Sequence, residues 1–587
     1  MGNPGLEESK VTFTYRSIIE VGRRARSITV ASVLLLLILT IHAFAAMVTG
    51  MEPYVQAVTT NSIYVLVECD STSAATVQFG LTNGYGSTAT TESSMVTTAS
   101  PLTYVHRIKL AGLSPNTQYH YRASHAGGAW SADSTFYTAV LPGTPFRFAA
   151  YADTRTQTTV HNNVASRVKT ANPRFQLVAG DLCNDSLYET FKSEWFLSNE
   201  LALQALSPAY NAPGNHEEYS TNSKAFFQSP SSSSGVQDYY SFDYGDVHIV
   251  SINNQATYTV NSTQYNWVAN DLATTTKPWK IVFFHRSAYV AGGHGEDATM
   301  IQWSNNIFVP KNVDLVITGH SHFYQHNLVS GINHYVLGTA GAPFATLDLK
   351  VYVIRSALEY HYGILDVTPT SIHMDVITDG GALLDKLDLV KTVSAAKAKI
   401  DGTLVDGTGL WTVTHVPSEA KVFYVQDALG VAGIRVETSG TKPAVGATVL
   451  IRGTLGTTAA GERVIQSATV TSKGTVTSKP RGMNNRAADS YNYILSKNIG
   501  VPTQGMLVKL WGQVTKSVTD PVLGPVFWLD DGAKAASGEP DGTKGLKVIE
   551  SGLSPAVNSY LKIAGVVSTF KVSGQPFRMI RYRESLP

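Results

Sequence analysis

The sequence predicts a multidomain chain with an N-terminal β-sandwich, a central α/β layered domain and C-terminal all-β small barrels. Residues 51–140 carry short stretches that alternate apolar and polar side chains. From residue 145 onward, apolar runs end in polar residues, and after about residue 395 two segments resemble each other. The chain has 587 residues, a length that fits about three to four domains.

The first 45 residues have the pattern of a signal peptide (1–45). An arginine-rich flank at 23–26 precedes an apolar run at 30–41, and small residues follow at 43–45. The alternative is an uncleaved anchor, but the run is shorter than the roughly 20 residues that a spanning helix needs. We therefore expect a secreted, periplasmic or cell-surface protein with no stable membrane span after signal cleavage.

The composition excludes a strong uniform surface charge. The formal net charge is +1, and 15% of the residues are charged against 43% hydrophobic ones. No global field favours nucleic acid or an anionic membrane, so any attraction for anions must be local. The two cysteines, Cys69 and Cys183, fall in different predicted domains, which predicts two free thiols. Cys183 is expected to be a buried structural residue rather than a metal ligand.

Residues 51–140 predict the β-sandwich. Stretches such as 62–67 and 76–79 alternate apolar and polar residues, and Gly, Asn and Ser separate them. Residues 113–122 form a turn that leads into a strand with two tyrosines. This combination resembles a fibronectin type III module.

Residues 145–390 predict the α/β domain. Buried strands with helical connections are typical of a layered α/β sheet, and a helix is expected at 159–170. Each apolar run closes on a polar residue, and ligands collect at strand ends in such folds. The runs are 146–153, 175–181, 280–285 and 313–320.

The C-terminal region contains an internal repeat. It predicts two small barrels, at 395–480 and 505–587, with a connector at 480–505. Their texture resembles oligonucleotide/oligosaccharide-binding (OB) barrels. The stretches at 423–427, 433–436 and 449–453 have counterparts at 527–531, 545–548 and 561–565.

Five pieces at the predicted strand ends supply metal-binding side chains. Carboxylates, an amide oxygen and imidazoles together suit Fe, Mn or Zn. Taken singly, each residue has a structural explanation. Asp153 could cap the next helix, Asn215 could be a turn residue, and His285 could be a buried core imidazole. Five pieces in order, each closing an apolar run, favour a two-metal centre instead. They are Asp153, Gly180-Asp181, Gly214-Asn-His-Glu217, His285 and Gly319-His-Ser-His322.

These motifs resemble those of the calcineurin-like metallophosphoesterases. With the preceding fibronectin-like module, the chain is similar to the purple acid phosphatase branch over about residues 51–390. The resemblance implies a four-layer αββα metallophosphoesterase domain and a metal-dependent phosphoric ester hydrolase of the acid phosphatase type. It also implies two divalent or mixed-valence metal ions (Fe, Mn or Zn) and a metal-bound hydroxide that attacks phosphorus in line.

The resemblance further implies a role for each matching residue. Asp181 bridges the two ions, and His216 contacts the phosphate and protonates the leaving oxygen, so these two are the expected catalytic residues. The first ion is expected at Asp153, Asp181 and His322, and the second at Asp181, Asn215, His285 and His320.

The sequence departs from the purple enzymes at two positions. Asn184 replaces the tyrosine that gives them ferric iron and colour, so we expect a colourless protein in which Asn184 or water completes the first metal. Arg155 replaces a histidine that other members use, and it is interpreted as a phosphate clamp or as half of a surface salt bridge. Tyr324 is a candidate phosphate contact and no more than that on sequence grounds. The glycine-rich loop around His294 either lines the entrance or is a plain surface loop.

Three functions fit these residues. The leading hypothesis is an exported enzyme that hydrolyses a phosphorylated small-molecule substrate, a phosphomonoester. The alternative is a phosphodiesterase or nuclease-like activity, with nucleic acid or glycan bound at the C-terminal barrels. The barrel aromatics and arginines either form such a groove or fill the barrel cores. The second alternative is a catalytically inactive surface protein for binding or adhesion, against which His216 and the complete second-metal set argue.

Overall fold

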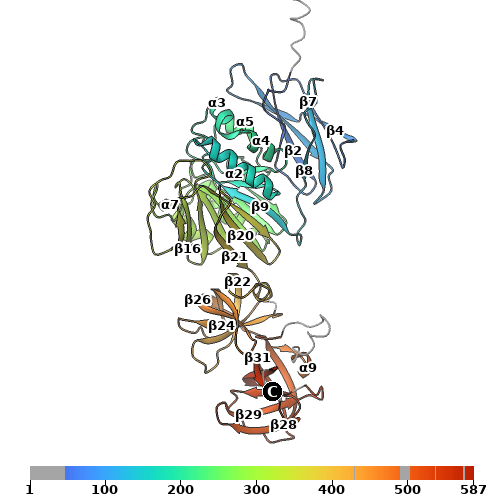
Figure 1. Cartoon of the computed structure of the whole chain (residues 1–587), viewed down its shortest axis with the longest axis vertical. Coiled ribbons are helices and arrows are strands. Elements are labelled where there is room, and N and C mark those ends of the chain that lie inside the picture. Colours follow the sequence, from blue (N-terminus) through green and yellow to red (C-terminus); the bar gives the residue numbers. More distant parts are fainter. Residues whose placement is uncertain are drawn as a thin grey trace, which may run out of the picture.

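The structure is a computed structural model that describes residues 46–586, except 429, 489–502, 536, 538, 573 and 574. The predicted signal peptide at 1–45 and much of the predicted connector lie outside the described residues. Within the described part, no helix is long and apolar enough to cross a lipid bilayer. Figure 1 shows an elongated molecule, with the C-terminal strands extending away from the N-terminal and central regions.

The N-terminal region is a pair of four-stranded antiparallel sheets. One has the order β1-β2-β6-β5 and the other β4-β3-β7-β8. Alternate side chains of both sheets, among them Val65, Val77, Ile108 and Tyr121, meet in a shared core, as the period of two of a half-buried strand requires. The strands are β1 (Tyr54–Gln56), β2 (Ser62–Cys69), β3 (Ala75–Gly80), β4 (Ser87–Thr90), β5 (Ser93–Val96), β6 (Tyr104–Ala111), β7 (Gln118–His125) and β8 (Ser134–Tyr137).

The central region alternates strands and helices along the chain. Its first helix, α2 (Thr158–Ala171), confirms the helix predicted at 159–170. The strands are β9 (Phe146–Tyr151), β10 (Gln176–Val178), β11 (Ala209–Asn211), β12 (Tyr240–Tyr244), β13 (Val247–Ser251), β14 (Trp279–Arg286), β15 (Leu315–Gly319), β16 (Tyr324–Val329), β17 (Ile332–Leu337), β18 (Val353–Ala357), β19 (His361–Val367), β20 (Ser371–Thr378) and β21 (Leu383–Val390). The other helices are α3 (Tyr188–Thr190), η1 (Phe191–Trp195), α4 (Ser198–Gln204), α5 (Thr221–Phe226), α6 (Thr263–Thr274), α7 (Ala298–Trp303) and η2 (Ser304–Phe308).

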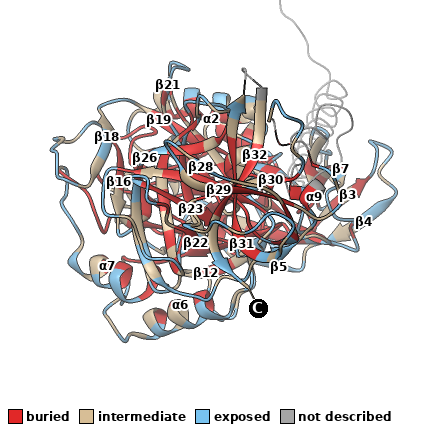
Figure 2. Ribbon diagram, turned by 90° about the horizontal axis from the view of Figure 1, so that it is seen from below, coloured by how far each residue is buried: buried red, intermediate tan, exposed pale blue. Residues whose placement is uncertain are grey.

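Two sheets of the central region pack against each other. One contains β11-β10-β9-β19-β20-β21, and the other has the order β12-β13-β14-β15-β17-β16-β18. A single apolar cluster joins them through buried side chains such as Phe148, Leu177, Ile281 and Ile317. Two further clusters join α2 to β9 and join α6 and α7 to β13, β14 and β15. The buried residues accordingly occupy the interior in Figure 2.

The C-terminal region contains two five-stranded units with the same strand order. The first is β22-β23-β24-β26-β25 and the second is β28-β29-β30-β32-β31. In addition, β22 pairs with β25 and β28 pairs with β31. These pairings close each sheet around an apolar core of its own. The strands are β22 (Leu404–His415), β23 (Val422–Gln426), β24 (Gly433–Thr438), β25 (Ala447–Thr457), β26 (Arg463–Thr475), β27 (Arg481–Gly482), β28 (Leu507–Asp520), β29 (Gly524–Asp530), β30 (Leu546–Ile549), β31 (Tyr560–Val572) and β32 (Gln575–Ser585), with a short helix α9 (Asn485–Ala488).

The first C-terminal unit continues a sheet of the central region. Strand β22 pairs in parallel with β21 through Leu389 and Val390, so one eleven-stranded sheet runs through both regions. The helix α8 (Val393–Lys397) lies between these two strands in the chain. The change of sequence pattern near residue 395 therefore falls on a short helix between two paired strands, and not on a free linker.

Candidate metal centre

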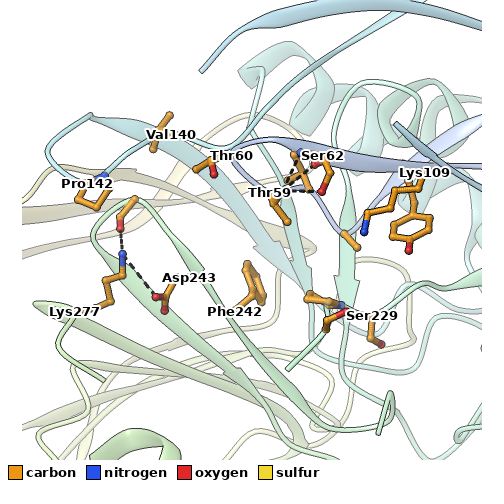
Figure 3. Close-up of a pocket in the computed structure, with 16 residues that line it drawn as sticks. Thr59, Thr60, Ser62, Lys109, Val140, Pro142, Ser229, Phe242, Asp243 and Lys277 are labelled. Atoms are coloured by element: carbon orange, nitrogen blue, oxygen red, sulfur yellow. Dashed lines mark hydrogen bonds and ion pairs between the residues drawn. The ribbon is translucent and has the colours of Figure 1, made fainter. Parts of the chain in front are cut away.

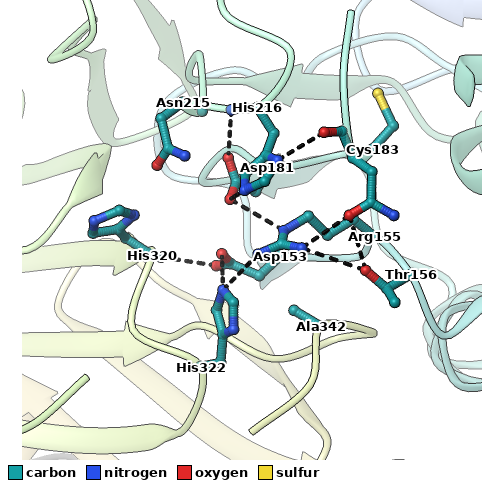
Figure 4. Close-up of polar contacts among 12 residues, drawn as sticks. Asp153, Arg155, Thr156, Asp181, Cys183, Asn215, His216, His320, His322 and Ala342 are labelled. Carbon is teal, nitrogen blue, oxygen red and sulfur yellow. Dashed lines mark hydrogen bonds and ion pairs between the residues drawn. The ribbon is translucent and has the colours of Figure 1, made fainter. Parts of the chain in front are cut away.

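The expected metal ligands come from the ends of parallel strands. Strands β9, β10 and β11 run parallel, as do β13, β14 and β15. Parallel strands bring their carboxyl ends to one edge of a sheet, which is where Asp153, Asp181 and His320 follow their strands. Figure 4 shows these side chains converging with His216 and His322.

Two groups of metal-binding side chains share one carboxylate. The first group is Asp153, Asp181 and His322, and the second is Asp181, His285 and His320. Within each group, one ligand atom from every residue lies within 4.8 Å of the others. Asn215 adds an amide oxygen, because its Oδ1 lies 3.1 Å from His285 Nε2. The structure thus brings together all six residues that the sequence assigns to two ions.

Backbone carbonyls fix which ring nitrogen of His285 and of His322 faces the centre. Nδ1–H of His285 donates to Ala179 O at 2.8 Å, and Nδ1–H of His322 donates to Pro343 O at 2.8 Å. In a neutral ring, the lone pair therefore lies on Nε2. Nε2 of His285 is 3.2 Å from Asp181 Oδ1. Orientation of this kind is typical of metal-binding histidines.

One buried carboxylate oxygen tests whether the residues fit a cation. Asp153 is fully buried, and its Oδ1 has no hydrogen-bond partner. This atom lies 3.5 Å from Nε2 of His322, which carries the ring's lone pair because Nδ1 donates to the carbonyl, and which also lies 3.3 Å from Nη2 of Arg155. A buried carboxylate oxygen without a partner is costly, and facing acceptors repel. A metal ion between them removes both penalties, so the residues fit the metal that the motif implies.

Burial and charge shift the pKa values in the centre. Burial opposes ionisation of Asp181, but His285, His216 and Arg155 hold the pKa of its carboxyl below the usual range. Burial alone would lower the pKa of His285, and the charge of Asp181 raises it instead to about 9. Burial and the neighbouring His285 lower the pKa of His320 to about 2. Without a cation, a proton on His285 thus balances Asp181, and a bound metal displaces such protons.

Three ligands hold a strained backbone. Asp153 (φ 54°), Asp181 (φ 54°) and His320 (φ 70°) all lie in the left-handed region. This conformation is uncommon for residues other than glycine and costs on the order of 1–3 kcal/mol each. Strain concentrated in three ligands of one cluster indicates that the fold sacrifices stability to aim these side chains.

Two glycines let the ligand loops approach closely. A Cβ on Gly214 would stand 2.3 Å from Asp181 Oδ1, and a Cβ on Gly319 would stand 2.2 Å from Asp153 Oδ2. Real Cβ atoms do not tolerate such contacts. These glycines of the sequence motifs therefore make room for the carboxylates.

Glu217 links the loops that carry the ligands, a role that sequence reasoning missed. Its carboxylate accepts hydrogen bonds from the backbone N–H groups of Gly214 (2.9 Å), Asp181 (3.2 Å) and Leu182 (3.2 Å). It is fully buried. Burial and the nearby Asp181 charge raise the pKa of Glu217 to about 8. Glu217 is part of the Gly214–Glu217 motif, but the motif alone does not indicate that its side chain joins this loop to the loop of Asp181.

His216 stands at the open side of the centre. Its Nδ1–H donates to Asn184 O at 2.7 Å, and its Nε2 lies 3.7 Å from Asp181 Oδ2. The side chain is 30% exposed, whereas Asp181 is buried. The ring therefore contacts both the ligand set and the solvent.

Arg155 and Asn184 fill the places where the motif departs from its relatives. Arg155 Nε lies 3.4 Å from Asp181 Oδ2, and Nη1 donates to Asn184 Oδ1 at 2.9 Å. Thr156 also donates to Asn184 Oδ1, while the Asn184 amide donates to Glu194. The amide oxygen of Asn184 is thus already occupied, and Arg155 faces the carboxylate that both donor groups share.

Three other residues near the motifs have different surroundings. The Tyr324 ring is fully buried, and its hydroxyl donates to Asp385 at 2.5 Å. Cys183 is a buried free thiol whose Sγ lies 3.1 Å from Asp185 O, as expected for a structural residue. The exposed His294 stacks on His320 with ring centroids 4.3 Å apart, which brings the glycine-rich loop to the mouth of the centre.

A separate pocket lies between the N-terminal and central regions. It has a volume of about 350 Å³ and is lined by Thr59, Lys109, Phe242 and Lys277, among others. Figure 3 shows that Lys277 pairs with Asp243 there. None of the expected metal ligands is among the residues that line it.

Known proteins resemble these two regions. Residues 146–324 match the model of the calcineurin-like phosphoesterase family, and residues 54–138 match that of the purple acid phosphatase N-terminal domain. Purple acid phosphatase 23 of Arabidopsis thaliana is 26% identical over 288 residues, which cover 41% of this chain and 61% of that protein. Acid phosphatase type 7 of Homo sapiens is 25% identical over 354 residues, covering 49% of this chain and 77% of that one.

One solved structure supports the same fold. Purple acid phosphatase PPD1 from yellow lupin (Lupinus luteus) seeds superposes with a TM-score of 0.52 at 16% identity, over 59% of this chain and 75% of that chain. The chain spans 53% to 61% of the length of three plant purple acid phosphatases that it matches by sequence. Proteins of these families are dinuclear metal enzymes, which agrees with the two donor groups. The chain therefore contains a region that matches the calcineurin-like phosphoesterase family, preceded by a region that matches the purple acid phosphatase N-terminal domain, and it is similar to purple acid phosphatases over these two regions.

Proposed function

We propose that the central domain is a two-metal phosphoesterase that hydrolyses phosphomonoesters. The observation that carries this proposal is the pair of donor groups that share Asp181. Two metal ions bound there supply a water-derived nucleophile and offset the charge that develops on the phosphoryl oxygens. Asp153, Asp181 and His322 would hold one ion, and Asp181, Asn215, His285 and His320 the other.

His216 is the proposed proton donor to the leaving oxygen. Because Nδ1–H donates to Asn184 O, the partly exposed Nε2 faces the centre and bears a proton whenever the ring is cationic. A general acid must reach the leaving oxygen directly or through one water. The ring is not required as a metal ligand, since the six donors above complete both groups without it.

Arg155 is the proposed phosphate clamp. Its side chain is 14% exposed, which does not suit a surface salt bridge, and its guanidinium lies beside Asp181. The planar guanidinium matches two phosphoryl oxygens at once. Water rather than Asn184 would complete the first metal, because Arg155 and Thr156 already donate to the Asn184 oxygen. Without a tyrosine at this position we expect an iron-loaded protein to be colourless.

Phosphodiester hydrolysis is the second candidate. Exposed aromatic residues favour it weakly: Trp511 (57% exposed) and Tyr560 (70% exposed) lie on the paired strands β28 and β31. Against it, Arg435 and Arg581 both pair with Glu419, and Trp528 is buried. A nucleic-acid groove needs free cations beside its aromatics, so these residues support a structural role more than a binding one.

Several finer proposals accompany this function. The clusters that join helices to both central sheets support a four-layer αββα arrangement. The paired antiparallel sheets support a fibronectin type III-like module, and the closed strand order supports OB-like barrels, with domain limits as predicted from the sequence. Export rests on the pattern of residues 1–45.

The test is hydrolysis of an aryl phosphomonoester and of the matching phosphodiester by protein loaded in turn with Mn, Zn and Fe. We expect faster turnover of the monoester, and loss of turnover in both Asp181→Ala and His216→Ala. Faster turnover of the diester would favour the second candidate. If metal binds but neither ester is cleaved, the phosphoesterase proposal is wrong and a binding protein becomes the better interpretation.

A further inference from the structure

A second cluster of metal-binding side chains lies inside the N-terminal sandwich. It consists of Cys69, His106 and His125, each at most 1% exposed. One ligand atom from each residue lies within 4.8 Å of the others. The proposed phosphoesterase function does not use them, and their burial in a separate sandwich sets them apart from the strand-end centre.

The three residues come from both sheets of the sandwich. Cys69 ends β2 and His106 lies on the neighbouring β6, where Val67 pairs with His106. His125 ends β7 in the opposite sheet. All three are buried with the inward-facing residues of their strands, so the cluster bridges the sheets at one end of the sandwich.

Both imidazoles are held in the orientation that a metal requires. Nε2–H of His106 donates to Ser71 O at 2.9 Å, and Nε2–H of His125 donates to Ser73 O at 2.7 Å. A carbonyl oxygen only accepts, so each neutral ring has its lone pair on Nδ1. A backbone carbonyl on the far nitrogen is a common partner of a metal-binding histidine.

Of the two Nδ1 atoms, that of His125 has no partner and that of His106 faces a hydroxyl that a cation would have to displace. Nδ1 of His125 is buried and has no hydrogen-bond partner. Nδ1 of His106 lies 3.0 Å from the Thr91 hydroxyl, but that hydroxyl has a second acceptor in Ala75 O at 3.3 Å. A buried nitrogen lone pair without a donor is unfavourable, and a cation would satisfy it.

A carboxylate stands beside the open lone pair. Asp70 Oδ1 lies 3.7 Å from Nδ1 of His125, a distance at which two acceptors face each other. The Asp70 side chain is 50% exposed and also accepts a hydrogen bond from the Ala46 backbone N–H. Asp70 lies outside the group of three mutually close donors, and its half-exposed carboxylate faces His125 from the solvent side.

We propose that Cys69, His106 and His125 bind one zinc ion, with Asp70 as the fourth donor, and that this ion joins the two sheets. One thiolate, two imidazoles and one carboxylate form a tetrahedral set of the kind that zinc prefers. On binding, the Cys69 thiol loses its proton to solvent and a sulfur–zinc bond forms. No change of oxidation state occurs, so the ion is structural and not redox-active.

The test uses cobalt(II) as a spectroscopic substitute for zinc in the purified protein after chelation. A thiolate bound to cobalt(II) gives a sulfur-to-metal charge-transfer band, which the cysteine-free strand-end donor set cannot produce. We expect this band in the wild type and in Asp181→Ala, and its loss in Cys69→Ser. Cys183→Ser is the matched control, because Cys183 is the other buried thiol and should leave the band unchanged.

Two further readouts protect the test against misfolding. Zinc should raise the Tm of the wild type by more than that of His125→Gln, and mass spectrometry should count one zinc fewer in that variant. Phosphoesterase activity of folded Cys69→Ser should persist, which separates this site from the proposed catalytic one. Absence of the cobalt–thiolate band in the wild type would overturn the proposal. Loss of the band in Cys183→Ser but not in Cys69→Ser would also overturn it.

Discussion

The strand-end centre and the sandwich cluster collect similar side chains by different structural means. In the centre, Asp153, Asp181 and His320 sit just past strands in a left-handed backbone. In the sandwich, Cys69 and His125 end regular strands, and neither has a positive φ. The centre reaches solvent through the partly exposed His216, whereas the three sandwich ligands are buried.

Under the two proposed functions, this difference separates a site for chemistry from a site for stability. Strained backbone and an open side cost stability, and they are useful only where a substrate must approach the ligands. The buried cluster on regular strands carries less backbone strain, and it has room for an ion but not for a substrate. The comparison predicts that changes in the centre alter turnover with little effect on the sandwich, and that changes in the sandwich do the reverse.

The largest expected effect comes from Asp181→Ala. This residue belongs to both donor groups, so its loss should remove both ions and reduce phosphomonoester turnover by more than the roughly 10²–10⁴-fold typical of losing a general acid. Metal content and turnover measured on the same sample check this. Asp185→Asn, in the same loop, is the control and should retain both. A variant that kept two ions would show that Asp181 does not bridge them.

A smaller effect is expected from His216→Ala. If His216 is the general acid, turnover should fall by about 10²–10⁴-fold while metal content stays at the wild-type level. The loss should shrink for an ester whose leaving group is acidic, because such an oxygen needs no proton. Equal losses for good and poor leaving groups would contradict the assignment.

Glu217→Gln tests the positioning of the loops. The amide would present an N–H group where Glu217 now accepts from backbone N–H groups, so the loops should separate slightly. We expect a loss of about 10–100-fold in metal affinity or activity, the range for residues that orient ligands. The exposed neighbour gives the control Glu218→Gln, which should behave as the wild type. No loss in Glu217→Gln would remove its positioning role.

The smallest expected effect is a pH-dependent change in Tm at His248, whose two ring nitrogens both pair with carboxylates. His248 pairs through Nδ1 with Asp243 (2.8 Å) and through Nε2 with Asp271 (2.7 Å), unlike the histidines with open lone pairs. Burial opposes its charge, but the two carboxylates raise the pKa of His248 to about 9. The unfolded value is about 6.5, so the pair stabilises the fold fully below that pH and loses this contribution as pH rises through about 9.

Thermal unfolding at two pH values checks this sign. The Tm of the wild type should exceed that of His248→Gln at pH 6, and the gap should narrow at pH 9.5. His120→Gln, at a partly exposed ion pair with Asp133, is the comparison and should change Tm little. A gap in His248→Gln that is the same at both pH values would contradict the prediction.

Much of the candidate site could be predicted from the sequence. Asp153, Asp181 and His285 each close an apolar run, and a strand end is a local feature that the chain itself encodes. Helix α2 could also be predicted from local sequence, since it begins and ends within one residue of the predicted limits. The hydrogen-bond partner of Tyr324 could not be predicted locally, because Asp385 lies 61 residues away on another sheet.

The sequence by itself determined the ordered set of metal-binding residues, the sandwich and the repeated C-terminal strands. These depend on short patterns, the alternation of apolar residues and the residue that follows each run. Only the tertiary structure decided that Glu217 ties the ligand loops, that β22 extends the central sheet, and that Cys69, His106 and His125 meet. These features join residues distant in the chain, and their contacts arise from sheet pairing and packing, which no local pattern records.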